Sequence, residues 1–138
     1  MKLRSFALFG ASAKKKKFGN MILAAMNKKY MRVYPMHRSA NFIDGHRAFS
    51  AFAELPEKPA GVILVIPPGE TEHVIDDIIT AGIKNVWFQQ GSVSDKAVRY
   101  CMLNGINVIS NECVLMFLDH PGFPHNLHKW VWSIGAGK

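Results

Sequence analysis

The chain has 138 residues and a formal net charge of +7, with 49% hydrophobic and 20% charged residues. This length suits one domain, and the composition argues against disorder, which needs low hydrophobicity and high net charge. No run approaches the ~20 apolar residues that span a bilayer, and two cysteines are too few for a disulfide framework. Neither an integral membrane protein nor a disulfide scaffold is therefore expected.

Positive charge is concentrated near the N-terminus. Residues 1–38 contain ten Lys and Arg residues and no acid, whereas residues 39–138 contain seven Lys and Arg residues and ten acids. We therefore expect an anionic partner to meet the first third of the chain. Apolar residues after Lys2 and Arg4, followed by Ala11-Ser12-Ala13, imitate a short secretory signal, and the acid-free start imitates a transit peptide. We interpret residues 5–9 instead as a strand of the core, and expect a cytoplasmic protein.

Strand and helix patterns alternate along the chain. Strands are predicted at residues 5–9, 31–34, 61–66, 85–88 and 106–109, of which the continuous β-branched run 61–66 is the clearest. Pro35 is expected to stop the second strand. Helices are predicted at 19–29, 70–81 and 94–104, with Ser94 as an N-cap. Residues 41–53 are predicted to hold a short edge strand around Ala48-Phe49 and a helical turn, and residues 113–118 another turn of helix.

The apolar positions of the first two helices predict which side chains face a sheet. These are Met21, Ile22, Ala25 and Met26 in the first helix, and Val74, Ile78, Ile79 and Ala81 in the second.

This alternation predicts an α/β fold: a Rossmann-like, doubly wound parallel sheet of about five strands in three αβα layers. Residues 1–120 form the predicted domain, and residues 121–138 a tail that packs on it or on a partner subunit, as in a homodimer. In such sheets ligands bind outside the carboxyl ends of the strands, where the strand order reverses. The segments that follow the strands, 10–17, 35–38, 67–69, 89–91 and 110–113, are therefore the candidate ligand contacts.

The first of these segments favours an anion. Gly10 after the first strand would let the backbone approach a phosphate, and the N–H groups at the next helix start favour negative charge. The run Lys14–Lys17 adds four cations, although such a run is also typical of a solvated surface loop. No Gly-Lys-[Ser/Thr] follows at P-loop spacing, and no G-x-G-x-x-G is present.

The second segment carries a basic pair. An NAD site needs an acid at the end of the second strand to hold the ribose diol, but this chain has Pro35-Met36-His37-Arg38. His37 and Arg38 suit a phosphorylated ribose, as in NADP or coenzyme A, better than NAD. The alternative is an ordinary exposed basic pair.

The remaining segments are less specific. Pro67-Pro68 would make a rigid apolar ledge for an adenine ring, or would merely end the strand. Gln89 or Gln90 could bond an amide, and Gly91 would permit close backbone approach. Cys113 is either a core residue or a thiol near the ligand edge, whereas Cys101, inside a helix pattern, is expected in the core.

Other chemistry finds little support in the sequence. His120, His125 and His128 lack the paired spacing of zinc ligands, so no metal site is expected. Trp130 and Trp132 could stack on nucleic acid or pack back onto the domain. No G-x-S-x-G elbow, H-E-x-x-H motif or framed carboxylate pair is present, so no catalytic residues are assigned.

Five motifs occur in the order typical of one family: FALFGAS at 6–12, RVYP at 32–35, GVILVIPP at 61–68, NVWFQQG at 85–91 and Glu112-Cys113. The chain thereby resembles the stand-alone CoA-binding domain family, which is similar to the N-terminal domain of the succinyl-CoA synthetase alpha subunit. The resemblance implies a Rossmann-like fold that binds coenzyme A at the carboxyl ends of its strands.

The resemblance also implies roles for single residues. Gly10, Ala11 and Ser12 would cradle the pyrophosphate, and Pro35 would lie near the adenosine. Ile66, Pro67 and Pro68 would line the path of the adenine or the pantetheine. Gln89 and Gly91 would flank the pantetheine arm, and Cys113 would lie near its thiol.

Together these inferences predict a protein that binds coenzyme A or acyl-CoA in a non-catalytic or regulatory role. Lys15, Lys16, Lys17, His37 and Arg38 complete the predicted contacts. An NADP-dependent enzyme and a nucleic-acid-binding module that uses the basic N-terminal third are the alternatives; no membrane partner is expected.

Overall fold

The computed structural model describes residues 5–29, 31–89, 91–110 and 115. Its elements, in chain order, are β1 (Ser5–Phe9), α1 (Phe18–Lys28), β2 (Arg32–Met36), β3 (Phe42–Ile43), β4 (His46–Arg47), the 3-10 turn η1 (Phe52–Glu54), β5 (Gly61–Leu64), α2 (Pro68–Thr80), β6 (Asn85–Phe88), α3 (Asp95–Leu103) and β7 (Asn107–Ser110).

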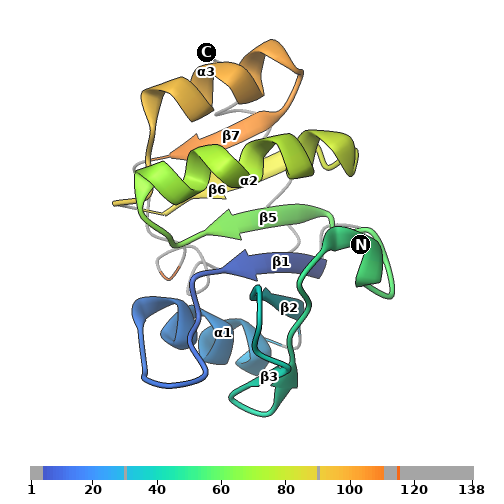
Figure 1. The fold of residues 1–138 in the computed structure, drawn as a ribbon, viewed down its shortest axis with the longest axis vertical. Helices are drawn as coiled ribbons and strands as arrows, with labels where there is room; N and C mark the ends of the chain where they lie inside the picture. Colours follow the sequence, from blue (N-terminus) through green and yellow to red (C-terminus); the bar gives the residue numbers. More distant parts are fainter. Residues whose placement is uncertain (1–4, 30, 90, 111–114, 116–138) are drawn as a thin grey trace.

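Five strands form one parallel sheet in the order β2-β1-β5-β6-β7. Counted along the chain these strands read 2-1-3-4-5, so the order reverses between β1 and β5. Figure 1 shows the arrowheads of β1, β5, β6 and β7 pointing to the same side of the molecule. The predicted Rossmann-like α/β fold is confirmed, and its switch point lies between β1 and β5.

Helices cover both faces of the sheet. Leu8 of β1 and Ile63 of β5 lie in a buried cluster with α1, whereas Ala7 and Leu64 lie in a second cluster with α2 and α3. All four residues are at most 1% exposed. Because successive side chains of a strand point to opposite faces, burial of both faces requires an apolar residue at every position. This requirement explains the unbroken apolar run in β5.

Pro35 does not stop β2, as the sequence predicted; the strand continues through it to Met36. Pro35 pairs with Leu8 of β1, and its carbonyl accepts a 2.9 Å hydrogen bond from the Phe49 N–H. The N and C=O of a strand residue point to the same side, so the Pro35 nitrogen faces away from β1. The missing N–H therefore costs no bond to β1, which is the usual reason why an edge strand tolerates proline.

A hairpin that we did not predict, β3–β4, lies between β2 and β5. Its tip residues Asp44 and Gly45 have φ values of 50° and 80°. Positive φ at both central residues is the signature of the tight two-residue hairpin turn, for which Asp-Gly is a preferred sequence. Beyond the hairpin, Phe49 forms an isolated bridge with Met36, which confirms the short edge pairing expected there.

The buried face of each helix differs slightly from the predicted one. In α1, Ile22 and Met26 are buried as expected, but Met21 is 56% exposed and Leu23 is buried instead. In α2 the buried set includes Ile75, which we had not selected. The helical periodicity of the sequence therefore predicts the buried face of each helix to within one residue.

The element boundaries also shift by a few residues. β5 ends at Leu64 rather than at 66, and α2 begins at Pro68, where proline suits the first helical turn. Ser94 caps α3 as predicted, because its Oγ accepts a 3.2 Å bond from the Ala97 N–H. The turn of helix predicted at 113–118 and the tail 121–138 lie outside the described residues, except for Leu115.

Candidate functional site

A cavity of about 410 Å³ opens at the carboxyl ends of β1, β2 and β5, beside the switch point of the sheet. Gly10, Ala11 and Lys17 line it from the β1–α1 loop, residues 10–17. This loop lies on the side to which the strand arrows point in Figure 1. The lysine run therefore adjoins the carboxyl edge of the sheet, as the sequence predicted.

Two glycines let the loop, the strand and the helix meet through their backbones. Gly10 has φ +119°, and a Cβ built on it would lie 2.2 Å from the Val65 carbonyl oxygen. A Cβ on Gly19 would lie 2.5 Å from the Gly10 carbonyl carbon. A side chain at Gly10 would clash with the backbone that follows β5, and one at Gly19 would force the start of α1 away from the end of β1. Gly19 thus fills the close-packing role of the last glycine in a dinucleotide fingerprint, at a longer spacing.

The side chain of Asn20, which we had not predicted, fastens the two ends of the β1–α1 loop together. Its Oδ1 accepts from the N–H groups of Ser12 at 2.9 Å and Lys17 at 3.1 Å. Its Nδ2 donates to the Ser12 carbonyl at 2.9 Å and to Asp44 at 2.9 Å. Asn20 is only 3% exposed, and these bonds use the full capacity of its amide.

The loop therefore offers fewer backbone donors than the sequence suggested. The Ser12 and Lys17 N–H groups are occupied by Asn20, and those of Lys14 and Lys15 lie 3.1 and 3.4 Å from the Ser12 Oγ. Within the described part of the chain, the N–H groups of Ala11, Ala13 and Lys16 in this loop have no acceptor. Of these three residues only Ala11 lines the cavity.

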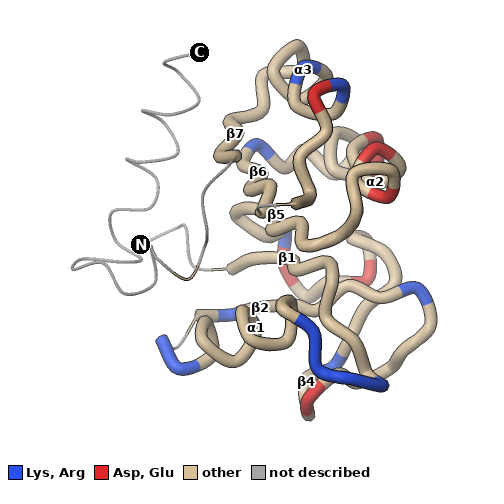
Figure 2. Tube along the Cα trace, turned by 90° about the vertical axis from the view of Figure 1, so that its left-hand side faces the viewer, with Lys and Arg blue, Asp and Glu red and all other residues tan. Residues whose placement is uncertain are grey.

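The four lysines of the run have different surroundings. Lys17 lines the cavity, whereas the Lys16 Nζ forms a 2.8 Å ion pair with Asp44 of the hairpin tip. The side chains of Lys14 and Lys15 are exposed and make no ion pair with a described residue. Figure 2 shows the run as a continuous blue segment ahead of α1.

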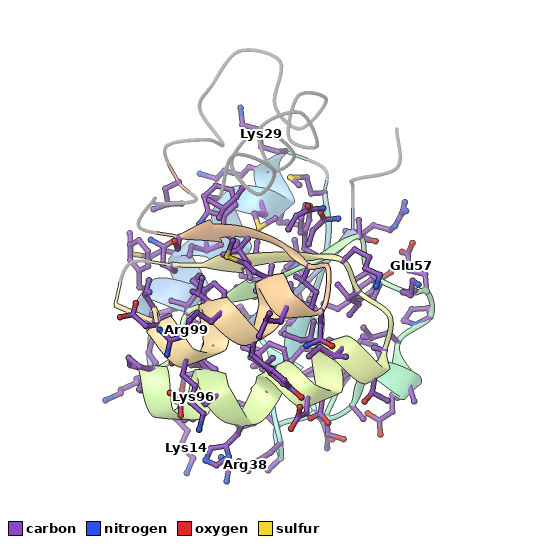
Figure 3. All side chains as sticks on the ribbon, turned by 90° about the horizontal axis from the view of Figure 1, so that it is seen from above. Lys14, Lys29, Arg38, Glu57, Lys96 and Arg99 are labelled. Carbon is purple, nitrogen blue, oxygen red and sulfur yellow. The ribbon has the colours of Figure 1, made fainter. Side chains whose placement is uncertain are left out.

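Not all the basic residues of the N-terminal third gather at this edge. Figure 3 shows Lys14 and Arg38 projecting from one side of the molecule and Lys29 from the opposite side. Arg32, at the start of β2, forms a 2.6 Å ion pair with Glu57. Among the described basic residues of this third, Arg32 therefore lies at the opposite end of β2 from His37 and Arg38.

His37 and Arg38, two of the predicted ligand contacts, line the cavity from the end of β2, while Pro35 is buried within the strand and Met36 lines the cavity in its place. The His37 Nδ1 accepts from the Ser39 N–H at 3.1 Å and the Ala40 N–H at 2.9 Å. These bonds leave the proton of the neutral ring on Nε2, which is therefore the donor available to a ligand.

The third wall comes from the end of β5 and from α2. Of the predicted ligand contacts here, Ile66 and Pro67 line the cavity, but the exposed Pro68 belongs to the first turn of α2 and does not. Glu70, His73 and Val74 of α2 complete this wall. Sequence reasoning had assigned Val74 to the core and had given His73 no role.

The residues predicted after β6 and β7 do not join this cavity. Gln89 is 2% exposed, its N–H donates to the Leu64 carbonyl at 3.0 Å, and it is not part of the lining. Gly91 is exposed, with φ +88°. Gln90 and Cys113 lie outside the described residues. Cys101 is buried as predicted, and burial raises the pKa of its thiol to about 12.

A second hollow of about 550 Å³ adjoins the first and shares Phe9, Met36 and Ser50 with it. It runs between α2 and the segment around η1, where Phe52 packs edge-on against Phe9 with ring centroids 5.8 Å apart. The two hollows together provide an elongated, partly apolar depression rather than a closed pocket.

Within the described ranges, no group of three or more His, Cys, Asp or Glu side chains could hold a metal ion. The tail histidines and tryptophans considered above fall outside those ranges. No helix among the described residues is long and apolar enough to cross a membrane.

Comparison with known proteins yields one family and several similar structures. The sequence model of a family described as a CoA binding domain matches residues 4–119. A conserved hypothetical protein from Pyrococcus furiosus is 30% identical, with a TM-score of 0.77; the match covers 83% of this chain and 98% of that one. A hypothetical protein from Pyrococcus horikoshii OT3 is 24% identical, with a TM-score of 0.78, over 83% of this chain and 81% of that one.

The same fold occurs within a larger enzyme. The dinucleotide-forming acetyl-coenzyme A synthetase 1 of Ca. Korarchaeum cryptofilum matches with a TM-score of 0.67 and 24% identity. The match covers 77% of this chain but only 25% of the synthetase chain.

Proposed function

The chain belongs to the CoA-binding domain family, and we propose that it binds coenzyme A or an acyl-CoA in the cavity at the carboxyl ends of β1, β2 and β5. The observation that carries this proposal is that three strand-end segments suited to binding a nucleotide line one cavity at the switch point. Gly10 and Ala11 come from the first, His37 and Arg38 from the second, and Ile66 and Pro67 from the third.

The diphosphate is proposed to lie against the β1–α1 loop. The Ala11 and Ala13 N–H groups are without acceptors in the described structure, and the start of α1 adds the positive end of a helix dipole. Lys17 adds a full charge at the cavity wall. Gly10 fixes the start of this loop, because its missing Cβ lets the chain turn tightly against the Val65 carbonyl.

The 3′-phosphate of the ribose is proposed to meet the end of β2. Arg38 offers a planar set of donors that matches phosphate oxygens, and the His37 Nε2 offers one more. Among the described residues, the one acid that lines the cavity is Glu70, which comes from α2 and not from this segment. These features support a ribose that carries a phosphate over one with a free diol.

Calorimetry with coenzyme A, 3′-dephospho-CoA, NADP and NAD tests the proposal. We expect coenzyme A to bind most tightly, and removal of its 3′-phosphate to weaken binding about tenfold, the effect of about 1.4 kcal/mol. If coenzyme A does not bind, the proposed function is wrong. Equal affinity for the dephospho form would remove the role of Arg38 and His37 while leaving the ligand assignment intact.

We further propose a binding role without turnover, in the cytoplasm. Most residues that line the cavity are apolar or basic, and Glu70 is the one acid among those described. Incubation with acetyl-CoA followed by mass spectrometry checks this: the thioester should be recovered intact. Hydrolysis that depends on the protein would show that it is an enzyme.

A further inference from the structure

The tip of the β3–β4 hairpin contacts the β1–α1 loop through one carboxylate. The Asp44 Oδ2 accepts a 2.9 Å bond from the Asn20 Nδ2, and the Oδ1 lies 2.8 Å from the Lys16 Nζ. Asp44 is 28 residues from Lys16 and 24 from Asn20 in the sequence. An acid is thus positioned beside a loop that the proposed function requires to bind an anion.

The two contacts differ in how easily they can be broken. The Lys16 side chain is 78% exposed, and exposed ion pairs contribute little to stability because solvent screens them. Asn20, by contrast, is 3% exposed, and its three other hydrogen bonds hold its amide in place. The carboxylate is therefore a fixed anion, and the Lys16 ammonium is a cation that another anion can take.

We propose that Asp44 is a specificity-determining residue of the β1–α1 loop: its carboxylate is an internal anion that competes with the phosphates of the ligand for Lys16. The inference rests on the proposed function. A ligand gains Lys16 only when its phosphate charge outweighs that of Asp44, so the site discriminates against ligands with little phosphate charge. Lys14, Lys15 and Lys17 are not subject to this competition, since none of them pairs with an acid in the described structure.

The substitution Asp44→Asn removes the negative charge of the side chain and preserves its size and its hydrogen-bond acceptor. Asparagine also tolerates positive φ, so the hairpin turn, with φ 50° at this position, is retained. Its Oδ1 can still accept from the Asn20 amide. We expect the affinity for coenzyme A and for inorganic pyrophosphate, measured by calorimetry, to rise about threefold to fivefold. Unchanged or weaker binding by a variant whose urea midpoint equals that of the wild type would overturn the proposal.

A double-mutant cycle with Lys16→Gln separates competition for Lys16 from the general field of the carboxylate. Lys16→Gln alone should change the affinity by less than about twofold, because Lys16 is already occupied. In the Lys16→Gln background, Asp44→Asn should then have no further effect beyond about twofold. A full gain in that background would show that Lys16 is not the contested group.

Carbon-13 NMR of the Asp44 carboxyl gives a readout that a merely structural role would not move. Hydrogen bonds from Lys16 and Asn20 hold the pKa of Asp44 below its ordinary value. Saturating pyrophosphate should raise this pKa as Lys16 leaves Asp44, and an unchanged titration would contradict the proposed competition for Lys16.

The two proposals can be tested separately. If pyrophosphate binds and coenzyme A does not, the proposed ligand is wrong, but the competition between Asp44 and a phosphate can still be measured. Failure of both to bind overturns both proposals.

Discussion

Gly19 of α1 packs directly on the carbonyl group of Gly10, so closely that a Cβ at position 19 would lie 2.5 Å from the Gly10 carbonyl carbon and oxygen. The obstructing atoms are backbone and cannot rotate away. The first turn of α1 is therefore held rigidly against the start of the β1–α1 loop, which begins the candidate site.

Gly19→Ala is expected to destabilise the fold by about 1–3 kcal/mol, because α1 must move off β1 to admit a methyl group. Urea unfolding measures this loss. The same displacement should weaken ligand binding, since Ala11 follows Gly10 in the cavity wall.

Gly69→Ala is the matched control for this substitution. Gly69 occupies the same position in α2 that Gly19 occupies in α1, directly after the first helical residue, but nothing lies within 4 Å of a Cβ built there. It should leave stability unchanged or raise it by about 0.4–1 kcal/mol. Equal losses of stability for Gly19→Ala and Gly69→Ala would show that the contact between Gly19 and the Gly10 carbonyl does not contribute to stability.

Asn20→Asp tests how the loop is fastened. An aspartate could still accept from the Ser12 and Lys17 N–H groups, but it would place a carboxylate against the Ser12 carbonyl and Asp44. We expect a loss of about 1–3 kcal/mol at pH 7. The loss should shrink as the pH falls through the carboxyl range, because the introduced side chain can donate again once it is protonated. A loss that does not depend on pH would mean that shape, rather than donor chemistry, fixes the loop.

The contrast between Gly10 and Asn20 shows what local sequence can reveal. The strand 61–66 and the glycine that ends β1 were predictable because a buried parallel strand and a tight departure from it each leave a contiguous pattern. Asn20 follows no such pattern: its role depends on Ser12 and on Asp44, 24 residues away. Asp44-Gly45 did carry a turn signal, but two-residue strands around it are too short to show alternation.

The same reasoning explains why the site was only partly predictable. The order of the strands in the sheet determines which strand-end segments share a cavity. The sequence of a single segment does not reveal that order. Gln89 follows β6, outside the switch point between β1 and β5, and the cavity forms without it. His73 was missed because it lies on a helix that the sequence assigned to packing.

Glu57→Gln should reduce the loss of folding stability that occurs as the pH falls from 7 to 3. Hydrogen bonds from Arg32, at 2.6 Å, and from the Tyr34 hydroxyl lower the pKa of Glu57. A lowered pKa stabilises the fold above the ordinary value for glutamate, and this stability is lost as the pH falls through the folded value. The effect should stay below about 1 kcal/mol, since the Arg32 side chain is 61% exposed. Urea midpoints between pH 7 and pH 3 measure it, and identical profiles for the variant and the wild type would refute the linkage.

Cys101 should be unreactive in the folded protein. Burial raises the pKa of its thiol to about 12, so the thiolate that reacts with alkylating reagents is almost absent at pH 8. Mass mapping after iodoacetamide treatment should find Cys101 modified in urea but not in buffer. Because its folded pKa lies above the unfolded value, Cys101 contributes stability that falls as the pH rises from about 9 toward 12. Cys101→Ala should make that alkaline decline shallower.

Lysine position, rather than lysine number, should determine ligand affinity. Lys15→Gln with Lys17→Gln removes two charges from the β1–α1 loop, and Lys28→Gln with Lys29→Gln removes two from the other end of α1. We expect the loop pair to weaken coenzyme A binding about tenfold, on the order of 0.7 kcal/mol for each lysine, and to make it less sensitive to salt. The helix-end pair should change the affinity by less than about twofold, because its charges lie far from the cavity in a screened solvent. Neither pair should lower the melting temperature by more than about 3 °C, since these side chains are exposed. Equal weakening by both pairs would mean that the ligand responds to net charge alone.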